Sequence, residues 1–475
     1  MQSKKTKIVA TMGPASASSK DVLKNMILSG TNVCRLNFSH GSHKDHLSTI
    51  KMIRELNNEL RLNVAILADL QGPKIRIGEV EDNGVELVQG AELIITTNEC
   101  IGTKYKVYLT YQNFPKDVVV GDKVLMDDGK LQVEVTATNG KDEVRTKVLY
   151  GGILSSKKGV NLPSTKISLP CLTEKDLIDL DFAIAHKLDW IGLSFVRSAR
   201  DIIELKHIIA KNGSTAKVIA KIEKPEAIED IDDIIIATDA LMVARGDLGV
   251  EVPMETVPGL QKMMIKKCRS YAKPTIVATQ MMESMIENIT PSRAEVNDVA
   301  NAVLDGADAV MLSGETSVGK YPVEVIQAMS KIVREVEKSE EIYYKEEMPE
   351  KNQERFISDS ICFNASRLAA RVEARGIVTM TFSGYTAYKI SSQRPKADTF
   401  VFTENKQILT QLNLVWGVKG YFYDKMVSTD HTIADCKYIL KKKGLLKSGD
   451  LVINIASVPI EEKGPSNMVK LSYIE

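Results

Sequence analysis

The sequence has little of several features that mark particular classes of protein. It carries no excess of either charge, since 62 basic and 62 acidic residues give a formal net charge of zero. This argues against a general binder of nucleic acid or of membrane surfaces, because such proteins usually have a basic excess. Aromatic residues make up only 5% of a chain that is 44% apolar, a composition typical of a soluble α/β enzyme rather than of a disordered or fibrous protein.

The chain also lacks any framework of cysteines and any long apolar run. Its six cysteines are scattered and never form a Cys-x-x-Cys pair, so they indicate small apolar residues in a reducing compartment rather than disulfides or a zinc site. No apolar run approaches the roughly 18 residues that a membrane span needs, and no signal peptide precedes the first strand. We therefore expect a cytoplasmic, soluble protein of roughly two to four domains.

A regular alternation of apolar strands and helical stretches is the main feature that is present. Strands are predicted before residue 70 and again after residue 173, at 7–12, 32–37, 63–69, 190–195, 217–222, 240–244, 275–278 and 309–312. Three strands plus five make eight βα units with buried, β-branched strands. This pattern predicts a TIM barrel built from residues 1–71 and 168–340.

Two further regions break or follow this alternation. Residues 72–167 show no helical period, and their short alternating runs are separated by Asn-Gly, Asp-Gly and Gly-Gly turns, which predicts an all-β insert. The insert lies in the third βα loop, on the catalytic face of a TIM barrel, and so could act as a lid. After an acidic, lysine-rich connector, residues 356–475 alternate again, and we expect a separate C-terminal α/β domain there.

Charged side chains gather at the carboxyl ends of two of the expected strands. Lys221 and Glu223 point to the same side because they are two residues apart in a strand, and Asp247 follows the next apolar run. TIM barrels carry their chemistry at this end, and two carboxylates on adjacent strands could hold magnesium, with water and substrate oxygens completing its shell. The alternative is a pair of parallel strands with ordinary solvated ends.

The other strand ends add positive charge and polar groups. Arg35 and Arg76 join Lys221 as cations suited to a phosphoryl group, and Gly246 opens a helix whose N–H groups could take a substrate carboxylate. Polar residues at the remaining ends are Asn37, Ser39, His40, Asp69, Lys74, Thr279 and Ser313. Together they indicate a small anion that carries both phosphate and carboxylate, with magnesium bridging. The sequence shows no Ser–His–Asp or Cys–His set.

Seven segments, in order along the chain, resemble the pyruvate kinase family. They are Met-Gly-Pro-Ala-Ser (12–16), Arg-Leu-Asn-Phe-Ser-His-Gly (35–41), Lys-Lys-Gly-Val-Asn-Leu-Pro (157–163), Lys-Ile-Glu (221–223), Ala-Arg-Gly-Asp-Leu-Gly (244–249), Ala-Thr-Gln-Met-Met-Glu-Ser-Met (278–285) and Leu-Ser-Gly-Glu-Thr (312–316). The resemblance covers nearly the whole chain, insert and C-terminal domain included. It implies a glycolytic enzyme, a homotetramer, that moves a phosphoryl group between phosphoenolpyruvate and ADP to give pyruvate and ATP.

The resemblance also implies roles for the residues around the reacting groups. Lys221 would stabilise the transferring phosphoryl group, which Arg35 and Arg76 would also contact, unless these cations form only structural ion pairs. Glu223 and Asp247 would hold magnesium or manganese. With Arg35 and Lys221, the helix start at Gly246 and Asp247 and the side chain of Thr279 would bind the substrate, and Thr279 and Ser313 would belong to the polar path that protonates the enolate.

The nucleotide side is implied in the same way. Asn37, Ser39 and His40 would line it together with Arg76, although His40 could be a simple turn residue. Lys158 lies at the exit of the insert and would reach the phosphates only when the insert closes as a lid. A solvated charge is the alternative interpretation of Lys158.

One departure from the family pattern concerns potassium. Many members that need potassium carry Asp-Thr-Lys-Gly-Pro-Glu after the third strand, whereas this chain has Asp69-Leu70-Gln71-Gly72-Pro73-Lys74. An ammonium group is a tethered monovalent cation, so Lys74 could replace potassium at a site formed by Asn37, Ser39, Asp69 and Leu70. We therefore expect activity without added potassium; the alternative is that Lys74 is a solvated loop charge.

In the C-terminal domain, a hydroxyl-rich turn joins a strand to a helix. The resemblance implies an allosteric sugar-phosphate site there, with Thr381, Ser383, Gly384 and Thr386 as candidates, since hydroxyls and a helix start suit a phosphate. An ordinary helix start remains open, and the effector could be another phosphorylated metabolite or none.

Two other functions compete with this interpretation. One is a barrel lyase or mutase that acts on phosphoenolpyruvate or pyruvate with the same two carboxylates, but such an enzyme has no nucleotide for a lid to cover. The other is a non-catalytic metabolite sensor, and the joint presence of Lys221, Glu223, Asp247 and Thr279 argues against lost catalysis. The sequence leaves the nucleotide preference open.

Overall fold

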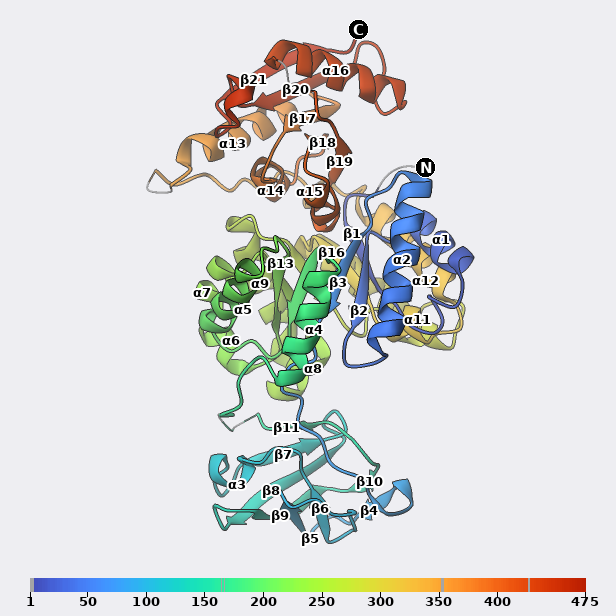
Figure 1. Cartoon of the computed structure of the whole chain (residues 1–475), viewed down its shortest axis with the longest axis vertical. Coiled ribbons are helices and arrows are strands. Elements are labelled where there is room, and N and C mark those ends of the chain that lie inside the picture. The colour runs from blue at the N-terminus through green and yellow to red at the C-terminus, as the bar shows by residue number, and fades with distance from the viewer. Residues whose placement is uncertain (1–3, 164, 166, 352–353, 426–427) are drawn as a thin grey trace.

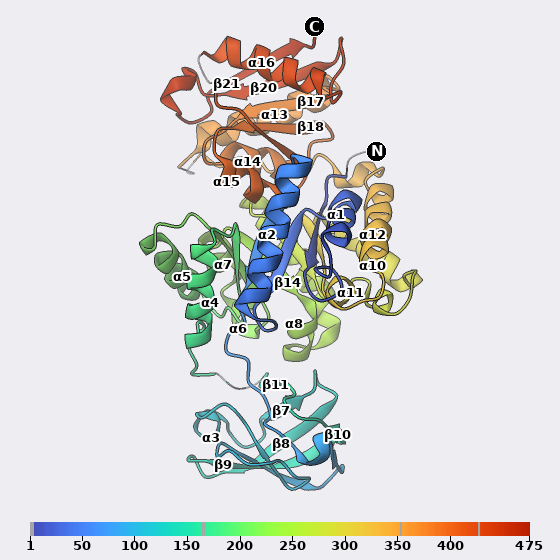
Figure 2. The same ribbon diagram turned by 45° about the vertical axis from the view of Figure 1, so that its right-hand side comes forward.

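Three bodies follow one another along the long axis of the molecule (Figure 1). The structure, a computed structural model, describes residues 4–163, 165, 167–351, 354–425 and 428–475. The β-rich insert lies at one end, the barrel in the middle and the C-terminal domain at the other end, and a view turned by 45° shows the same order (Figure 2). No helix among these residues combines the length and apolar character that crossing a bilayer requires.

The central body is a closed barrel of eight parallel strands, as the βα alternation predicted. In spatial order β1, β16, β15, β14, β13, β12, β3 and β2 surround the axis, and β1 pairs with both β2 and β16 to close it. The strands are β1 (Lys7–Thr11), β2 (Val33–Asn37), β3 (Ala65–Asp69), β12 (Trp190–Leu193), β13 (Lys217–Ile222), β14 (Ala240–Ala244), β15 (Thr275–Ala278) and β16 (Ala309–Leu312).

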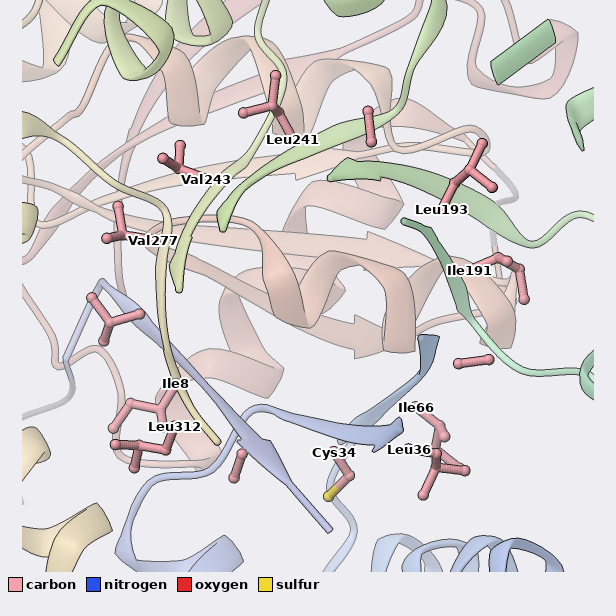
Figure 3. Close-up of a cluster of buried hydrophobic side chains, with 14 of the residues drawn as sticks. Ile8, Cys34, Leu36, Ile66, Ile191, Leu193, Leu241, Val243, Val277 and Leu312 are labelled. Carbon is pink, nitrogen blue, oxygen red and sulfur yellow. The ribbon is translucent and has the colours of Figure 1, made fainter. Parts of the chain in front are cut away.

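Helices cover the outside of the barrel because alternate strand residues point outward and are apolar. Figure 3 shows such residues from several strands, among them Ile8, Ile66, Val243 and Leu312. The helices around the barrel are α1 (Lys20–Ser29), α2 (His43–Leu60), α4 (Glu174–Ala185), α5 (Ala199–Lys211), α6 (Pro225–Glu229), α7 (Ile231–Ala237), α9 (Val257–Ser270), α10 (Arg293–Asp305), α11 (Gly314–Ser317) and α12 (Pro322–Val336). The short helix α8 (Arg245–Glu251) lies at the end of the barrel that faces the insert (Figure 1). Several begin with a capping box, as at Ser42, which fixes where the helix starts.

The insert leaves the barrel after β3, and the chain returns to it at α4. Its main sheet has the order β11-β7-β8-β9-β5-β6, and β10 pairs with β4 beside it. The strands are β4 (Val85–Leu87), β5 (Glu92–Thr96), β6 (Lys106–Tyr108), β7 (Lys123–Met126), β8 (Leu131–Thr138), β9 (Glu143–Tyr150), β10 (Gly152–Leu154) and β11 (Val160–Asn161). Two short helical turns, Glu81–Asn83 and α3 (Phe114–Asp117), interrupt the strands, and the alternating pattern did not reveal them. The exact limits of the domains stay a prediction.

The C-terminal body is an α/β domain with one sheet, in the order β19-β18-β17-β20-β21. Only β21 is antiparallel to its neighbour. Its elements are α13 (Phe356–Arg371), β17 (Gly376–Met380), α14 (Tyr385–Ser392), β18 (Asp398–Thr403), α15 (Lys406–Gln411), β19 (Val418–Phe422), α16 (Thr429–Lys442), β20 (Leu451–Ala456) and β21 (Met468–Tyr473).

Polar contacts join the C-terminal domain to the amino-terminal face of the barrel. Arg394 is 2% exposed and pairs with Asp308 at 3.0 Å, while the backbone N–H of Trp416 also donates to Asp308. Asn413 donates to the backbone oxygen of Asn63 just before β3. The carboxyl ends of the strands face the insert at the opposite side (Figure 1), so the chemistry expected there is separated from the C-terminal domain by the length of the barrel.

Candidate active site

A buried cluster of charges occupies the mouth of the barrel, on the side of the insert. Lys221, at the end of β13, is 8% exposed, and its Nζ lies 2.6 Å from Ser194 Oγ and 2.9 Å from Glu223 Oε1. The same Nζ lies 3.1 Å from Asp69 Oδ1, and Asp69 Oδ2 accepts from Arg35 Nε at 2.6 Å. Two cations and two carboxylates therefore compensate one another, as buried charges must.

The electrostatics of this cluster keep its members charged. Burial opposes the ionisation of Asp69, but the positive charges of Lys221 and Arg35 outweigh it and hold the pKa of Asp69 below its usual value. Burial likewise opposes protonation of Lys221, yet Asp69 and Glu223 raise its pKa above the usual range. Lys221 is thus a fully charged ammonium group in a site almost closed to water, where its field is strong.

Glu223 and Asp247 form an acidic pair that fits a divalent cation. They come from neighbouring positions, because β13 and β14 are paired and Asp247 lies in the first turn of α8, directly after β14. Burial, and then the charge of Asp247, raise the pKa of Glu223 even though Lys221 opposes this. A cation would relieve that excess of negative charge, and magnesium needs only one or two carboxylates. No cluster of three or more metal-ligating His, Cys, Asp or Glu side chains occurs among the residues that the structure describes.

Thr279 is held beside this pair in an unusual backbone conformation. It has φ 68°, which costs a non-glycine residue energy and is often found at functional sites. Its hydroxyl donates to the backbone oxygen of Ala278 at 2.6 Å and accepts from the N–H of Gly246 at 2.7 Å. A Cβ on Gly246 would lie only 3.3 Å from this hydroxyl, so a glycine suits the close approach. One N–H of the α8 start is thereby already used.

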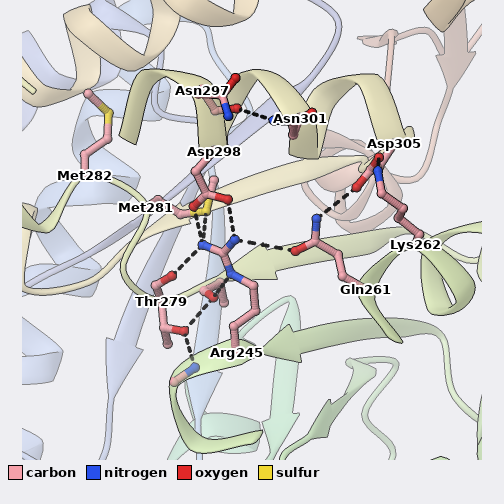
Figure 4. A network of polar contacts seen from close by, with 12 residues as sticks. Arg245, Gln261, Lys262, Thr279, Met281, Met282, Asn297, Asp298, Asn301 and Asp305 are labelled. Atoms are coloured by element: carbon pink, nitrogen blue, oxygen red, sulfur yellow. Dashed lines mark hydrogen bonds and ion pairs between the residues drawn. The ribbon is translucent and has the colours of Figure 1, made fainter. Parts of the chain in front are cut away.

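Arg245 holds the backbone of the strained Thr279 in place, and this role was not apparent from the sequence. Its guanidinium donates to the backbone oxygen of Thr279 at 2.8 Å and to both carboxylate oxygens of Asp298 on α10, at 2.6 and 2.7 Å (Figure 4). Sequence reasoning also missed Ser194, which binds Lys221 and donates to the backbone oxygen of Leu70 at 2.7 Å. Its position at the carboxyl end of a barrel strand, just after β12, is the one feature of the sequence that could have indicated this role.

A second region, with a cavity of about 820 Å³, opens beside the charge cluster. Arg35, Asn37, His40 and Ser313 all line it, and the backbone N–H of Ser39 donates to Asn37 Oδ1. Burial lowers the pKa of His40, and the charges of Arg76, Lys74 and Arg35 lower it further. The structure therefore brings Asn37, Ser39 and His40, three of the residues expected on the nucleotide side, together with Ser313.

Ser313 is oriented by a buried carboxylate two residues on. Its backbone N–H donates to Glu315 Oε2 at 2.6 Å, and the N–H of Met282 donates to Glu315 Oε1 at 3.1 Å. Burial raises the pKa of Glu315. Glu315 thus links the turns that follow β15 and β16, where the two hydroxyl residues expected to handle a proton are found.

The charged residues at the insert do not reach the cluster in this structure. Arg76 Nη1 donates to the backbone oxygen of Lys157 at 2.9 Å, and Lys158 pairs with Asp127 at 2.7 Å within the insert. Lys74 is exposed and lines a small cavity between the insert and the barrel, which Asp247 also lines. Its ammonium group is not paired with Asp69, whose oxygens face Arg35 and Lys221.

Comparison with known proteins identifies the family. The model of the pyruvate kinase barrel domain matches residues 3–326, and that of the pyruvate kinase alpha/beta domain matches residues 359–472. The chain belongs to the pyruvate kinase family. It is 44% identical to pyruvate kinases of Geobacillus stearothermophilus and Corynebacterium glutamicum, covering 99% of this chain and 80% and 98% of theirs. The crystal structure of a pyruvate kinase from Cryptosporidium parvum matches with a TM-score of 0.93 and 36% identity, covering 99% of this chain and 96% of that one.

Pyruvate kinases are phosphotransferases, so membership confirms the expected class of enzyme. Membership of the family assigns no role to any single residue of this chain. The loop from Thr381 to Thr386, where the sequence predicts an allosteric site, illustrates this. There the hydroxyl of Thr381 accepts from the N–H of Gly384 at 3.0 Å, that of Ser383 accepts from the N–H of Tyr385, and that of Thr386 lies 3.0 Å from the hydroxyl of Ser466. These are contacts of a turn that enters α14, and the allosteric site stays a prediction.

The charge cluster leads to a prediction about stability and pH. Asp69→Asn leaves two buried cations short of a carboxylate, so we expect a loss of about 3–5 kcal/mol in the free energy of unfolding at pH 7. Because the folded pKa of Asp69 is lowered, its contribution is complete above its unfolded pKa of about 3.9 and is lost as the pH falls through the folded value.

Thermal unfolding of wild type and Asp69→Asn at several pH values tests this. The difference between the two midpoints should be constant from pH 7 to 5 and should narrow below pH 4, whereas Asp181→Asn, at an exposed carboxylate on α4, should behave as wild type throughout. A difference that widens on acidification would contradict the assignment.

Proposed function

We propose that this protein catalyses the transfer of the phosphoryl group of phosphoenolpyruvate to ADP, giving pyruvate and ATP, with magnesium and in the cytoplasm. The observation that carries the proposal is Lys221, a buried and fully charged ammonium group between Asp69 and Glu223. It faces the mouth of the barrel beside the acidic pair of Glu223 and Asp247. A cation and a metal site at this end suit a substrate with phosphate and carboxylate groups.

Positioning and electrostatics account for the transfer step. The bond between phosphorus and the enol oxygen breaks, the phosphoryl group passes to a terminal oxygen of ADP, and its charge grows on the equatorial oxygens. The ammonium group of Lys221 stabilises that charge without reorganisation, because Ser194 and two carboxylates hold it in place. Arg35 is fixed by Asp69 and, through Nη1, by the hydroxyl of Thr11 at 2.9 Å, so its remaining N–H groups can face the phosphate.

Glu223 and Asp247 would hold the magnesium ion, and manganese suits the same oxygens. When bound, the ion neutralises charge on the substrate's phosphoryl and carboxylate oxygens. The start of α8 at Gly246 lies beside this pair, so its N–H groups not taken by Thr279 can bind the substrate carboxylate.

The enolate left after transfer must take up a proton at carbon to become pyruvate. Thr279 and Ser313 are the hydroxyls on this side of the site, and neither is an acid by itself. The hydroxyl proton of Thr279 is directed to Ala278, so we infer that the two residues order water that supplies the proton. Arg245 is a positioning residue in this scheme, because it acts through the backbone of Thr279.

The nucleotide and the lid complete the site. ADP would occupy the 820 Å³ cavity lined by Asn37 and His40, next to Ser39. Closure of the insert would bring Lys158 from Asp127 to the phosphates and free Arg76 from its contact with Lys157. A homotetramer, and an effector at Thr381, Ser383, Gly384 and Thr386, are further parts of the proposal that rest on the family resemblance alone.

The proposed reaction predicts a specific assay result. Pyruvate formed from phosphoenolpyruvate, measured by coupling to lactate dehydrogenase, should depend on both ADP and magnesium. Lys221→Met should lower turnover about a hundred- to a thousandfold while phosphoenolpyruvate still binds, because Arg35 and the metal pair remain. Lys217→Met, at the opposite end of the same strand, is the matched control and should stay close to wild type. Pyruvate released without ADP, or normal turnover in Lys221→Met, would refute the proposal.

The proposed replacement of potassium by Lys74 gives a separate prediction. Exchanging potassium for tetramethylammonium should leave turnover of the wild type unchanged, because closure of the insert would bring the tethered ammonium group of Lys74, which lines the cavity between the insert and the barrel, to the potassium position. Lys74→Glu should introduce a potassium requirement, whereas Lys104→Glu, an exposed change of the same charge on the insert, should not. A clear rise in wild-type turnover on adding potassium would rule this role out.

A further inference from the structure

A strained residue, Phe195, follows β12 at the mouth of the barrel. It has φ 55°, which is an outlier for a bulky side chain and persists only where the surroundings enforce it. In this conformation its backbone N–H donates to Glu223 Oε2 at 2.8 Å, while Glu223 Oε1 lies 2.9 Å from Lys221 Nζ. The N–H of Phe195 therefore fixes one oxygen of this buried carboxylate, and Lys221 fixes the other.

The ring of Phe195 packs against Gly72, at the point where the chain leaves the barrel for the insert. Gly72 has φ 68°, and a Cβ on it would lie 2.7 Å from Cδ2 of Phe195 and 3.1 Å from Cβ of Ser194. A glycine is thus required twice, by the backbone conformation and by the close approach. A larger residue would have to displace the ring, and with it the N–H that contacts Glu223.

The segment in which the chain returns from the insert supports the same turn. Cys171, which is buried, donates through its thiol to the backbone oxygen of Ser194 at 3.4 Å. Asp176, fully buried, joins the two connections of the insert. Its Oδ1 accepts from the N–H of Gly72 at 3.1 Å, and its Oδ2 accepts from the N–H and the hydroxyl of Thr173 at 2.9 and 2.6 Å. Both connections of the insert to the barrel therefore meet at the turn that holds Glu223.

One alternative is that packing at a strand end explains the strain of Phe195 by itself. Two observations favour a role at the acidic pair of Glu223 and Asp247. The main-chain donor of Phe195 lies on an oxygen of the first carboxylate. Its side chain lines the small cavity between the insert and the barrel, which Asp247 also lines. The strained residue thus contacts or borders both members of the pair.

We propose that Phe195 is a positioning residue for the metal ligand Glu223 and that Gly72 keeps it in the required conformation, an assignment that rests on the proposed metal site at Glu223 and Asp247. A hydrogen bond from outside the coordination shell orients a ligating carboxylate and so raises the affinity for the ion. Because Gly72 lies at the base of the insert, the same contact links the insert to the metal site.

Calorimetric titration of the full chain with manganese, in the absence of substrates, tests the proposal. Gly72→Ala should weaken manganese binding at least about tenfold, or 1.4 kcal/mol, which is the size of effect that such supporting contacts have on metal affinity. Gly213→Ala is the matched control. Gly213 has φ 67°, and a Cβ there would meet nothing within 4 Å among the described residues. The control therefore shares the backbone strain without the contact, and it should bind manganese as wild type.

A second set of variants keeps the test open even where Gly72→Ala fails to fold. Phe195→Gly retains the N–H and adopts a positive φ without strain, so it should bind manganese nearly as wild type. Phe195→Ala has neither the ring nor that freedom and should bind several-fold less tightly. In Gly72→Ala/Phe195→Gly the new Cβ no longer meets Cδ2, so most of the affinity lost in Gly72→Ala should return.

The outcomes separate this proposal from the proposed function. Wild-type manganese affinity in Gly72→Ala, or equal affinities in Phe195→Gly and Phe195→Ala, would overturn the positioning role and leave the proposed reaction intact. A wild type that binds no manganese would overturn the metal site itself, and the positioning role with it. During turnover, the magnesium concentration that gives half the maximal rate of pyruvate formation should rise in Gly72→Ala by a larger factor than kcat falls. A fall in kcat alone would contradict the proposal.

Discussion

The pairing of Lys221 with Asp69 and Glu223 is the interaction on which the mouth of the barrel depends. The members of this cluster come from β2, β3 and β13, with Ser194 added just after β12. Each charge is buried, so each is tolerable only because the others are present. The same arrangement that satisfies this constraint also fixes an ammonium group, a guanidinium group and an acidic pair in one place, before any substrate, nucleotide or lid contributes.

A buried lysine at the opposite, amino-terminal end of the barrel, Lys7, shows what happens when a buried cation has no carboxylate in contact with it among the described residues. Lys7 donates to the backbone oxygen of Val418, and burial, followed by the charge of Lys419, lowers the pKa of this lysine to about 7 although Glu337 opposes them. At the active site the pKa of Lys221 is raised instead. The pKa values of two buried lysines at the two ends of one barrel are thus shifted in opposite directions. Lys221 lies within ion-pair distance of two carboxylates, whereas Lys7 lies within that distance of none among the residues that the structure describes.

Much of this could be predicted from the sequence, because it depends on local pattern. The eight strands follow from their apolar runs, and Lys221, Glu223 and Asp247 follow from where those runs end. Contacts between distant elements could not be predicted in this way. The support of Thr279 by Arg245 depends on Asp298, which lies on a helix after the next strand. The pairing of Lys158 with Asp127 depends on how the hairpins of the insert pack on one another, which no local pattern of residues encodes.

The closure of the barrel by β1 and β16 has a consequence for synthesis. Lys7 pairs with Ala309, so after its own synthesis β1 must wait for roughly 300 residues, or about 15 to 60 s at ordinary elongation rates, before its last neighbour exists. The insert, whose strands pair only with one another, can fold during that interval. Until β16 emerges, β1 presents an open, apolar edge of the kind that favours aggregation. The exposure of this edge therefore belongs to the incomplete barrel and ends when β16 pairs with β1.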